Sequence, residues 1–320
     1  MRNRLKTVNI FAFVVLGLFL MVSAVISVLT ALIPAFSLPT VVQTSLIYAL
    51  AFGIPAVIYA LYVRQKEGQP VHVTLSFRKL PVKSLLLCIA LGFLIQPVLS
   101  FVASLASLVF QDITTSSIQG MAEMPLVFFI ITTGILPAFF EELICRGMML
   151  DGYRNTPLWY MLLIPALFFG MLHLNFQQIS YAVVAGVLLA YLVKITGSIW
   201  SSMIVHLIIN GTQSLLLWIT ENTSLMDSVG GAAALLEEAS PLQTLISASI
   251  SAGVALPLFI LCIFALRRIH GFEEKKKAMA QVPMGWHQGS LLMYVILGIM
   301  FLMALLVEFL MPYLNAAALR

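Results

Sequence analysis

Two adjacent acids and one base interrupt an otherwise apolar segment of the chain. Glu141, Glu142 and Arg146 lie in the run FFEELICR, and ionisable side chains at membrane depth are costly and usually mark function. On a helix, Glu142 and Arg146 share a face and can pair, whereas Glu141 is rotated by about 100° from Glu142. We therefore predict a Glu142–Arg146 ion pair and a Glu141 that is free to act as a general base. In the structural alternative, both acids share Arg146.

Two later apolar segments each carry a polar pair with helical spacing. Phe169 precedes His173 by four residues, and His206 precedes Asn210 by four. Side chains with this spacing point into the same space. In the functional interpretation both histidines and Asn210 line a reaction site, and Phe169 walls it. In the structural interpretation they are hydrogen-bond partners between membrane helices.

The depths of these polar residues agree with one another. Measured from the end of each helix that we expect at the cytoplasm, at about 1.5 Å per residue, Glu141 lies roughly 20 Å deep, His173 roughly 24 Å, His206 roughly 18 Å and Asn210 roughly 24 Å. The four residues are therefore predicted to lie in one layer of the membrane.

Pro137 precedes Glu141 by four residues. A proline inside a helix frees the carbonyl four residues earlier, here that of Thr133, and kinks the helix. We expect this kink to make room for a water-holding cavity beside Glu141.

The composition shows which elements must position these residues. The chain has 320 residues, of which 61% are apolar and only 9% charged, with a mean hydropathy of +1.04. This excludes a soluble globular domain, and about 20 apolar residues suffice for one membrane crossing. We predict an all-α, polytopic transmembrane helix bundle with eight or nine spans, forming one integral membrane domain over 1–320 and carrying the site on buried helices. The expected spans are 8–33, 41–63, 84–110, 124–150, 158–173, 179–194, 197–219, 242–266 and 291–312.

The basic residues set the orientation. With nine alternating spans and a cytoplasmic N-terminus, every lysine and arginine except Arg320 falls on the cytoplasmic side, as the positive-inside rule requires. Losing one span would put the cluster at 267–277 on the wrong side. The net charge of +4 therefore reflects topology and does not indicate nucleic acid binding. The alternating run 71–78 predicts either an extended stretch at the cytoplasmic interface or an ordinary loop.

The three polar motifs together resemble a known family. EExxxR at Glu141, FxxxH ending at His173 and HxxxN starting at His206 look like the motifs of the CPBP family. That family unites type II CAAX prenyl endopeptidases with bacterial proteins of bacteriocin processing and self-immunity, formerly called Abi. The resemblance covers residues 124–215, and the helices within 242–312 are expected as additions to this core.

The resemblance implies hydrolysis of a peptide bond in or beside the membrane. Glu141 would be the general base on a water held with His173, while His206 and Asn210 would stabilise the oxyanion, a role that suits an amide in a dry site. This mechanism needs no cofactor. The family has also been described as metalloproteases, and Glu141, His173 and His206 could supply three ligands to a divalent metal such as zinc.

Glu142, Arg146 and Phe169 would support the site. A nucleophilic Cys145 or Ser202 is a weaker alternative, because no orienting acid accompanies either residue.

Three functions remain open on the sequence alone. The first is an intramembrane endopeptidase acting on a membrane-associated or lipid-proximal peptide, including a CAAX-like one, in the bilayer and, in a bacterium, the plasma membrane. The second is a non-catalytic self-immunity or membrane-binding protein. The third is a proton-coupled transporter, which would be expected to repeat the motif-bearing half. The sequence does not identify the substrate or the oligomeric state.

Overall fold

The computed structural model describes residues 2–33, 38–110, 118–222, 240–273 and 291–318. Within these ranges every regular element is a helix and no strand occurs, which confirms the predicted all-α bundle. The first half of the bundle contains α1 (Arg2–Leu32), α2 (Thr40–Ile47), η2 (Tyr48–Gly53), α3 (Ile54–Glu67), α4 (Val71–Thr74), α5 (Val82–Leu94) and α6 (Gln96–Ala106).

The motif-bearing helices follow these elements. They are α8 (Leu126–Ile130), η3 (Ile131–Ile135), α9 (Leu136–Glu142), η4 (Leu143–Met149), α10 (Leu150–Gly152), α11 (Leu158–Met171), α12 (Phe176–Thr196) and α13 (Trp200–Asn222), and the last two helices are α16 (Pro241–Ile269) and α18 (Leu291–Ala318). Eight continuous helical stretches in the described ranges are long and apolar enough to cross a membrane. The remaining predicted span, 158–173, corresponds to the 14-residue helix α11. Each predicted span therefore coincides with a helix.

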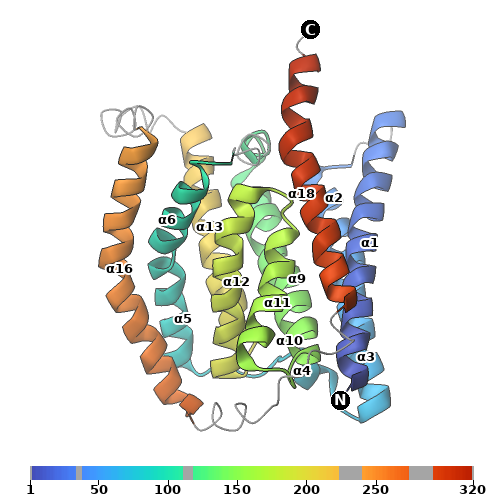
Figure 1. Cartoon of the computed structure of the whole chain (residues 1–320), viewed down its shortest axis with the longest axis vertical. Coiled ribbons are helices and arrows are strands. Elements are labelled where there is room, and N and C mark those ends of the chain that lie inside the picture. Colours follow the sequence, from blue (N-terminus) through green and yellow to red (C-terminus); the bar gives the residue numbers. More distant parts are fainter. Residues whose placement is uncertain (1, 34–37, 111–117, 223–239, 274–290, 319–320) are drawn as a thin grey trace.

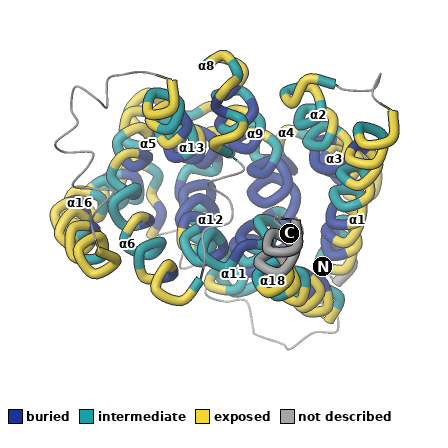
Figure 2. Tube along the Cα trace, turned by 90° about the horizontal axis from the view of Figure 1, so that it is seen from above, coloured by how far each residue is buried: buried dark blue, intermediate teal, exposed yellow. Residues whose placement is uncertain are grey.

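The motif-bearing helices lie inside the bundle (Figure 1). α12 packs against α11, α13 and α6, while α16 packs outside α5 and α6, and α18 packs against α1 and α11. The view from above shows buried residues concentrated on α12 and its neighbours and exposed residues on α16 (Figure 2). The most apolar window of α12 is 56% buried and that of α16 is 11% buried. α16 therefore turns most of its surface towards lipid.

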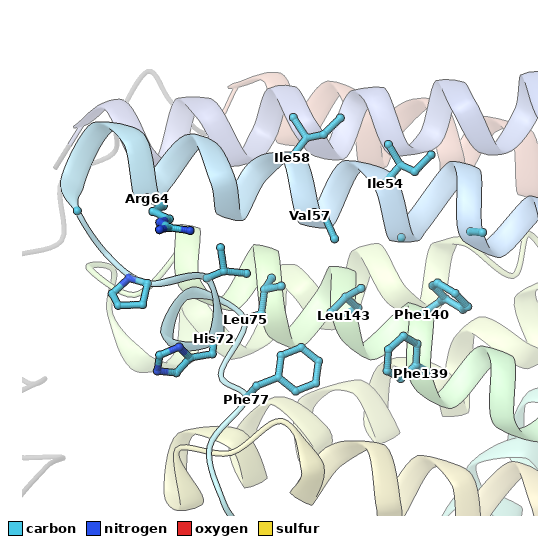
Figure 3. A pocket seen from close by; sticks show the side chains of 15 residues that line it. Ile54, Val57, Ile58, Arg64, His72, Leu75, Phe77, Phe139, Phe140 and Leu143 are labelled. Atoms are coloured by element: carbon cyan, nitrogen blue, oxygen red, sulfur yellow. The ribbon is translucent and has the colours of Figure 1, made fainter.

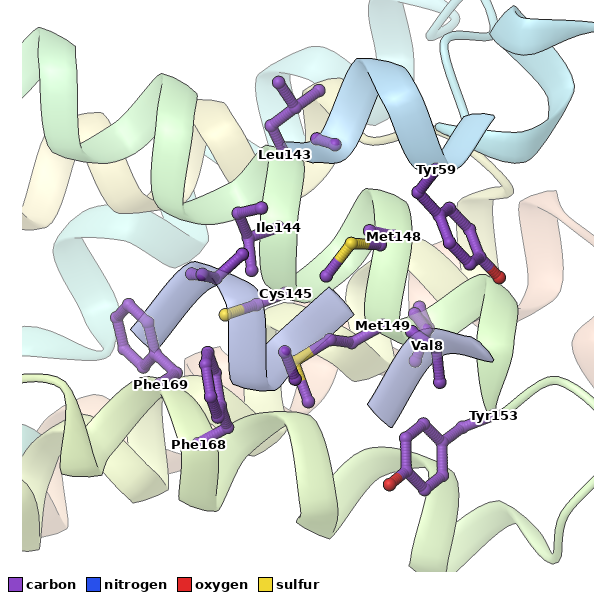
Figure 4. Packing of buried hydrophobic residues seen from close by; sticks show 14 of the residues in the cluster. Val8, Tyr59, Leu143, Ile144, Cys145, Met148, Met149, Tyr153, Phe168 and Phe169 are labelled. Atoms are coloured by element: carbon purple, nitrogen blue, oxygen red, sulfur yellow. The ribbon is translucent and has the colours of Figure 1, made fainter. Parts of the chain in front are cut away.

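Glycines allow close approach of the central helices. A Cβ on Gly186 of α12 would lie 2.9 Å from Ala166 Cβ of α11, and one on Gly92 of α5 would lie 2.8 Å from Ile208 Cβ of α13. Small residues let membrane helices approach closely, and association there depends on such packing. One core cluster joins α1 to the central helices, with Cys145 and Met149 packed near Phe168 (Figure 4).

Wide helical turns of the π type flank Glu141. η3 ends at Ile135, directly before α9, and η4 begins directly after Glu142. Such turns are often found at functional sites. The Thr133 carbonyl in η3, predicted to be freed by Pro137, accepts a hydrogen bond from Asn210 Nδ2 at 3.3 Å. A side chain from a neighbouring helix thus pairs with this backbone group.

The run 71–78 begins with the single helical turn α4 and contains no strand. The extended interpretation is therefore wrong, and the loop interpretation is correct for the part that follows Thr74. The backbone after α4 is held by hydrogen bonds to the α12–α13 connection, because Ile199 N donates to Ser76 O at 2.8 Å and Ser198 Oγ donates to Arg78 O at 2.6 Å. The path of this segment is therefore fixed by hydrogen bonds to residues far away in the sequence, which the alternation of apolar and polar residues cannot predict.

An ionic cluster gathers at the end of the bundle where α1 begins. Arg4 pairs with Asp151 at 2.7 Å and with Glu67 at 2.8 Å, and Arg154 also reaches Glu67 at 3.4 Å. Tyr59 OH donates to Asp151 Oδ2 at 2.9 Å. The ends of three spans that were predicted to share one membrane face are therefore joined.

Candidate active site

One cavity brings together the four residues predicted to be catalytic. It has a volume of about 560 Å³ and is lined by Glu141, His173, His206 and Asn210, together with Phe169 and side chains from the α2–η2 junction, α6 and α12. The four residues come from three different parts of the chain. The four residues, which were predicted to lie at a similar depth in the membrane, therefore line the same cavity.

One carboxylate oxygen of Glu141 accepts a hydrogen bond and the other has no hydrogen-bond partner. Tyr48 OH donates to Glu141 Oε1 at 2.8 Å. Glu141 Oε2 is buried and has no hydrogen-bond partner, and it lies 3.8 Å from His206 Nε2. A buried carboxylate oxygen without a partner is unusual. In a cavity it is the natural acceptor for a water proton.

Glu142 and Arg146 form the predicted ion pair. Arg146 Nη1 lies 2.6 Å from Glu142 Oε1, and both side chains are fully buried. Arg146 Nη2 also donates to the Gly186 carbonyl at 3.1 Å. The pair links the Glu141 helix to α12 and does not include Glu141, which contradicts the alternative in which both acids share the arginine.

Glu142 also orients His206. His206 Nδ1 lies 2.9 Å from Glu142 Oε1. Because that oxygen already accepts from Arg146, Nδ1 acts as the donor. Nε2 is then left facing the cavity, where Asn210 Nδ2 lies 3.2 Å away. Sequence reasoning paired Glu142 with Arg146 but did not predict this second contact.

The Phe169 ring packs against both histidines of the cavity. Its ring meets those of His173 and His206 edge-on, each with centroids 5.5 Å apart. The Arg146 guanidinium lies 4.5 Å from the Phe169 centroid, within cation–π range. Phe169 thus restricts the orientation of three polar side chains.

His173 lies in the turn just beyond α11, two residues after the helix ends at Met171. Its backbone N–H donates to Gly170 O at 3.1 Å. The next helix, α12, begins three residues later at Phe176, and the side chain of its N-cap residue Asn175 accepts from Gln178 N. This short turn fixes the histidine at the edge of the cavity.

The candidate metal ligands do not form a ligand set. No group of three His, Cys, Asp or Glu side chains in the described part of the chain is arranged to hold a metal ion. Tyr48 and Glu142 engage Glu141 Oε1 and His206 Nδ1, which leaves Glu141 Oε2 and His206 Nε2 on the cavity side, 3.8 Å apart. Three convergent ligands and an open position would be required for catalytic zinc. Glu141, His173 and His206 do not fit that requirement, so no step is assigned to a metal.

Tyr48 is the site residue that sequence reasoning missed. It is 93 positions from Glu141 and reaches it from η2, and no local spacing relates the two. The alternative nucleophiles fit less well. Cys145 is enclosed in the apolar core, and Ser202 Oγ is engaged with Ile199 O at 2.9 Å.

The fold and the cavity define the class of protein: an integral membrane protein with an acid–histidine site enclosed by its helices. Residues 123–212 match the family model described as type II CAAX prenyl endopeptidase Rce1-like. The matched segment contains Glu141, His173, His206 and Asn210. The match confirms the resemblance to this protease family and supports protease activity in general. A search of curated proteins and one of solved structures gave no significant match.

Proposed function

We propose that the protein is an intramembrane endopeptidase that hydrolyses a peptide bond of a membrane-associated substrate with a water activated by Glu141. The observation that carries the proposal is the shared cavity, in which an unpartnered Glu141 oxygen faces His206 and lies in the same lining as His173 and Asn210. A binding protein would not require an unpaired buried oxygen, which costs free energy.

The proposed reaction begins with a water between Glu141 Oε2 and His173. Glu141 takes one proton from this water while the oxygen attacks the scissile carbonyl carbon. The carbonyl π electrons move to the oxygen and form a tetrahedral oxyanion. Collapse of this intermediate breaks the C–N bond, and Glu141 returns the proton to the leaving amine.

Asn210 is the proposed main donor to the oxyanion. Its amide contacts with Thr133 O and His206 Nε2 are long, at 3.3 and 3.2 Å. A developing negative charge is a stronger acceptor than either. Glu142 holds the His206 ring in a fixed orientation beside the oxyanion position. Arg146 neutralises the buried charge of Glu142.

The N-terminus is proposed to lie in the cytoplasm, and in a bacterium the protein would lie in the plasma membrane. The basic-residue distribution supports this orientation, and the ionic cluster around Arg4 shows that three of the segments expected on the cytoplasmic side lie at the same end of the bundle. The substrate is proposed to be a lipid-proximal peptide, with a prenylated CAAX-like sequence as the first one to test.

The decisive experiment compares wild type with Glu141→Gln in proteoliposomes, using a fluorogenic CAAX-like peptide with and without a prenyl group and a library of single-span membrane peptides. Wild type is expected to cleave a member of this set, and Glu141→Gln to lose at least about a thousandfold in kcat, because the amide cannot accept the water proton. A chelator is expected to leave cleavage unchanged.

Glu123→Gln is the matched control, since Glu123 is exposed and does not line the cavity. It should retain wild-type cleavage. Equal cleavage by wild type and Glu141→Gln would overturn the proposed mechanism, and loss of cleavage in chelator would require a metal in it.

A further inference from the structure

A second large hollow lies outside the catalytic cavity, between α3 and the Glu141 helix. This groove has a volume of about 1180 Å³. Ile54, Val57 and Ile58 of α3 form one wall, and Phe139, Phe140 and Leu143 form the facing wall (Figure 3). The three α3 side chains are 44–50% exposed. In a membrane, these walls face lipid.

The chemistry of the groove differs between its two ends. Arg64 and His72 lie at one end and the two phenylalanines at the other (Figure 3). No acidic side chain is present among the lining residues, and no ion pair or hydrogen bond joins Arg64 to another residue in the described ranges. The polar end of the groove therefore carries an uncompensated cation.

The length of the groove matches one leaflet. Gly53 and Arg64, both in its lining, are separated by about 16 Å of helix at 1.5 Å per residue. Half of the hydrocarbon core measures about 15 Å. An amphiphile whose head group lies at Arg64 would thus reach the middle of the bilayer at Gly53.

The walls indicate what kind of chain can lie between them. Apart from Arg64 and His72, every lining side chain is apolar. A peptide backbone laid along such walls would leave its N–H and C=O groups without side-chain partners, which is costly. An acyl chain carries no such groups.

We propose that this groove binds one anionic phospholipid of the leaflet at the Arg64 end, with its phosphate at Arg64 and His72 and an acyl chain along Val57 towards Phe140. The acyl chain would contact Phe140, which connects the groove to the proposed active site through Tyr48. Phe140 stacks on Tyr48 with ring centroids 5.9 Å apart, and Tyr48 is the residue that donates to Glu141. The proposal concerns binding alone and does not depend on peptidase activity.

The test uses the full-length protein, delipidated in detergent and then offered micelles containing phosphatidylglycerol and phosphatidylcholine with the same acyl chains. Lipid retained on the protein is measured by native mass spectrometry. Wild type should retain phosphatidylglycerol in preference. Arg64→Gln should lower that preference about fivefold, the equivalent of about 1 kcal/mol for one cationic side chain at the surface.

Two matched controls separate specific from general effects. Lys66→Gln removes the same charge from the same helix end, but Lys66 does not line the groove. Val57→Trp should fill the groove and lower retention of both lipids, whereas Leu61→Trp, on the same helix but outside the lining, should not. Thermal unfolding checks that each variant is folded.

Equal lipid preference in Arg64→Gln and Lys66→Gln would overturn the anionic head-group site, and equal retention in the two tryptophan variants would overturn the acyl-chain site. Displacement of all retained phospholipid by a prenylated peptide would make the groove a peptide site and contradict the proposal. None of these results depends on cleavage, so they are separable from a failure of the peptidase assay.

Discussion

Tyr48 and Glu142 restrain two side chains of the proposed active site, Glu141 and His206, from opposite directions. Tyr48 holds one oxygen of Glu141, and Glu142 holds Nδ1 of His206. The oxygen and nitrogen that remain, Glu141 Oε2 and His206 Nε2, face each other at 3.8 Å. Catalytic side chains that are already fixed in this way lose little freedom when the substrate binds.

Removing the Tyr48 hydroxyl should therefore slow the reaction without weakening substrate binding. Tyr48→Phe keeps the ring stack on Phe140 but deletes the hydrogen bond to Glu141, and kcat is expected to fall about tenfold with KM unchanged. Steady-state kinetics in proteoliposomes measure the two constants separately. Tyr62→Phe, an exposed tyrosine in the same span, is the control. A rise in KM with kcat preserved would assign Tyr48 to substrate binding instead.

Local spacing explains which site contacts were predictable. The pair Glu142–Arg146 and the closeness of His206 to Asn210 follow from four-residue spacing on one helix, and both occur. The contact of Tyr48 with Glu141 joins residues 93 positions apart, and that of His206 with Glu142 joins residues 64 apart. Such contacts depend on how helices pack, which no window of sequence contains.

At the level of the elements, the helix that carries Glu141 is tied to α12 by a fully buried charge. Arg146 bridges Glu142 and the Gly186 carbonyl, and Gly186 lies at the close approach of α12 to α11. Breaking a buried ion pair by removing one partner leaves an uncompensated charge and is strongly destabilising.

Arg146→Met should consequently lower the free energy of unfolding by about 3–5 kcal/mol. The double variant Glu142→Gln/Arg146→Met should recover part of that loss, because no unpaired charge remains. Thermal unfolding in detergent gives the order of stabilities. Arg154→Met, which removes a partly exposed arginine from the ionic cluster, should cost about 1 kcal/mol or less. Arg146→Met no less stable than Arg154→Met would contradict the structural role of the buried pair.

Long apolar segments made the positions of the helices predictable, because the bilayer fixes the length of a spanning helix. The π-type turns η2, η3 and η4 were not predictable in this way. They change hydrogen-bond register without changing composition, and only Pro137 gave a local signal for a disturbance beside Glu141. Alternation at 71–78 likewise failed, because hydrogen bonds from Ser198 and Ile199 fix that segment.

On the scale of the whole molecule, the helices outside the matched segment flank it on opposite sides (Figure 1). α16 covers α5 and α6, while α1 and α18 lie together on the other side, where α18 reaches α11. We propose that 242–312 supplies additional helices around a catalytic core at 124–215 within one membrane domain. The matched segment alone would leave buried faces of α11 and α12 uncovered.

The proposed orientation is testable by labelling single cysteines from one side of the membrane. In a background with Cys88, Cys145 and Cys262 replaced, Gln243→Cys at the start of α16 should react with an impermeant maleimide in intact cells. Lys66→Cys at the end of α3 should react only after permeabilisation, because the positive-inside rule puts it in the cytoplasm. The background without cysteines controls for non-specific labelling. The reverse pattern would invert the topology.

The shortness of α11 bears on how water reaches the proposed active site inside a membrane. Its 14 residues span only about 21 Å of a hydrocarbon core about 30 Å thick. If α11 begins at the cytoplasmic edge of the core, as proposed, the turn with His173 and Asn175 lies about 9 Å short of the opposite edge. Irregular backbone at that depth is tolerated only when protein covers it or a water-filled space adjoins it, and both residues line the catalytic cavity. In the proposed reaction, the short helix would therefore let water reach the site, and one more helical turn there would be expected to dry it.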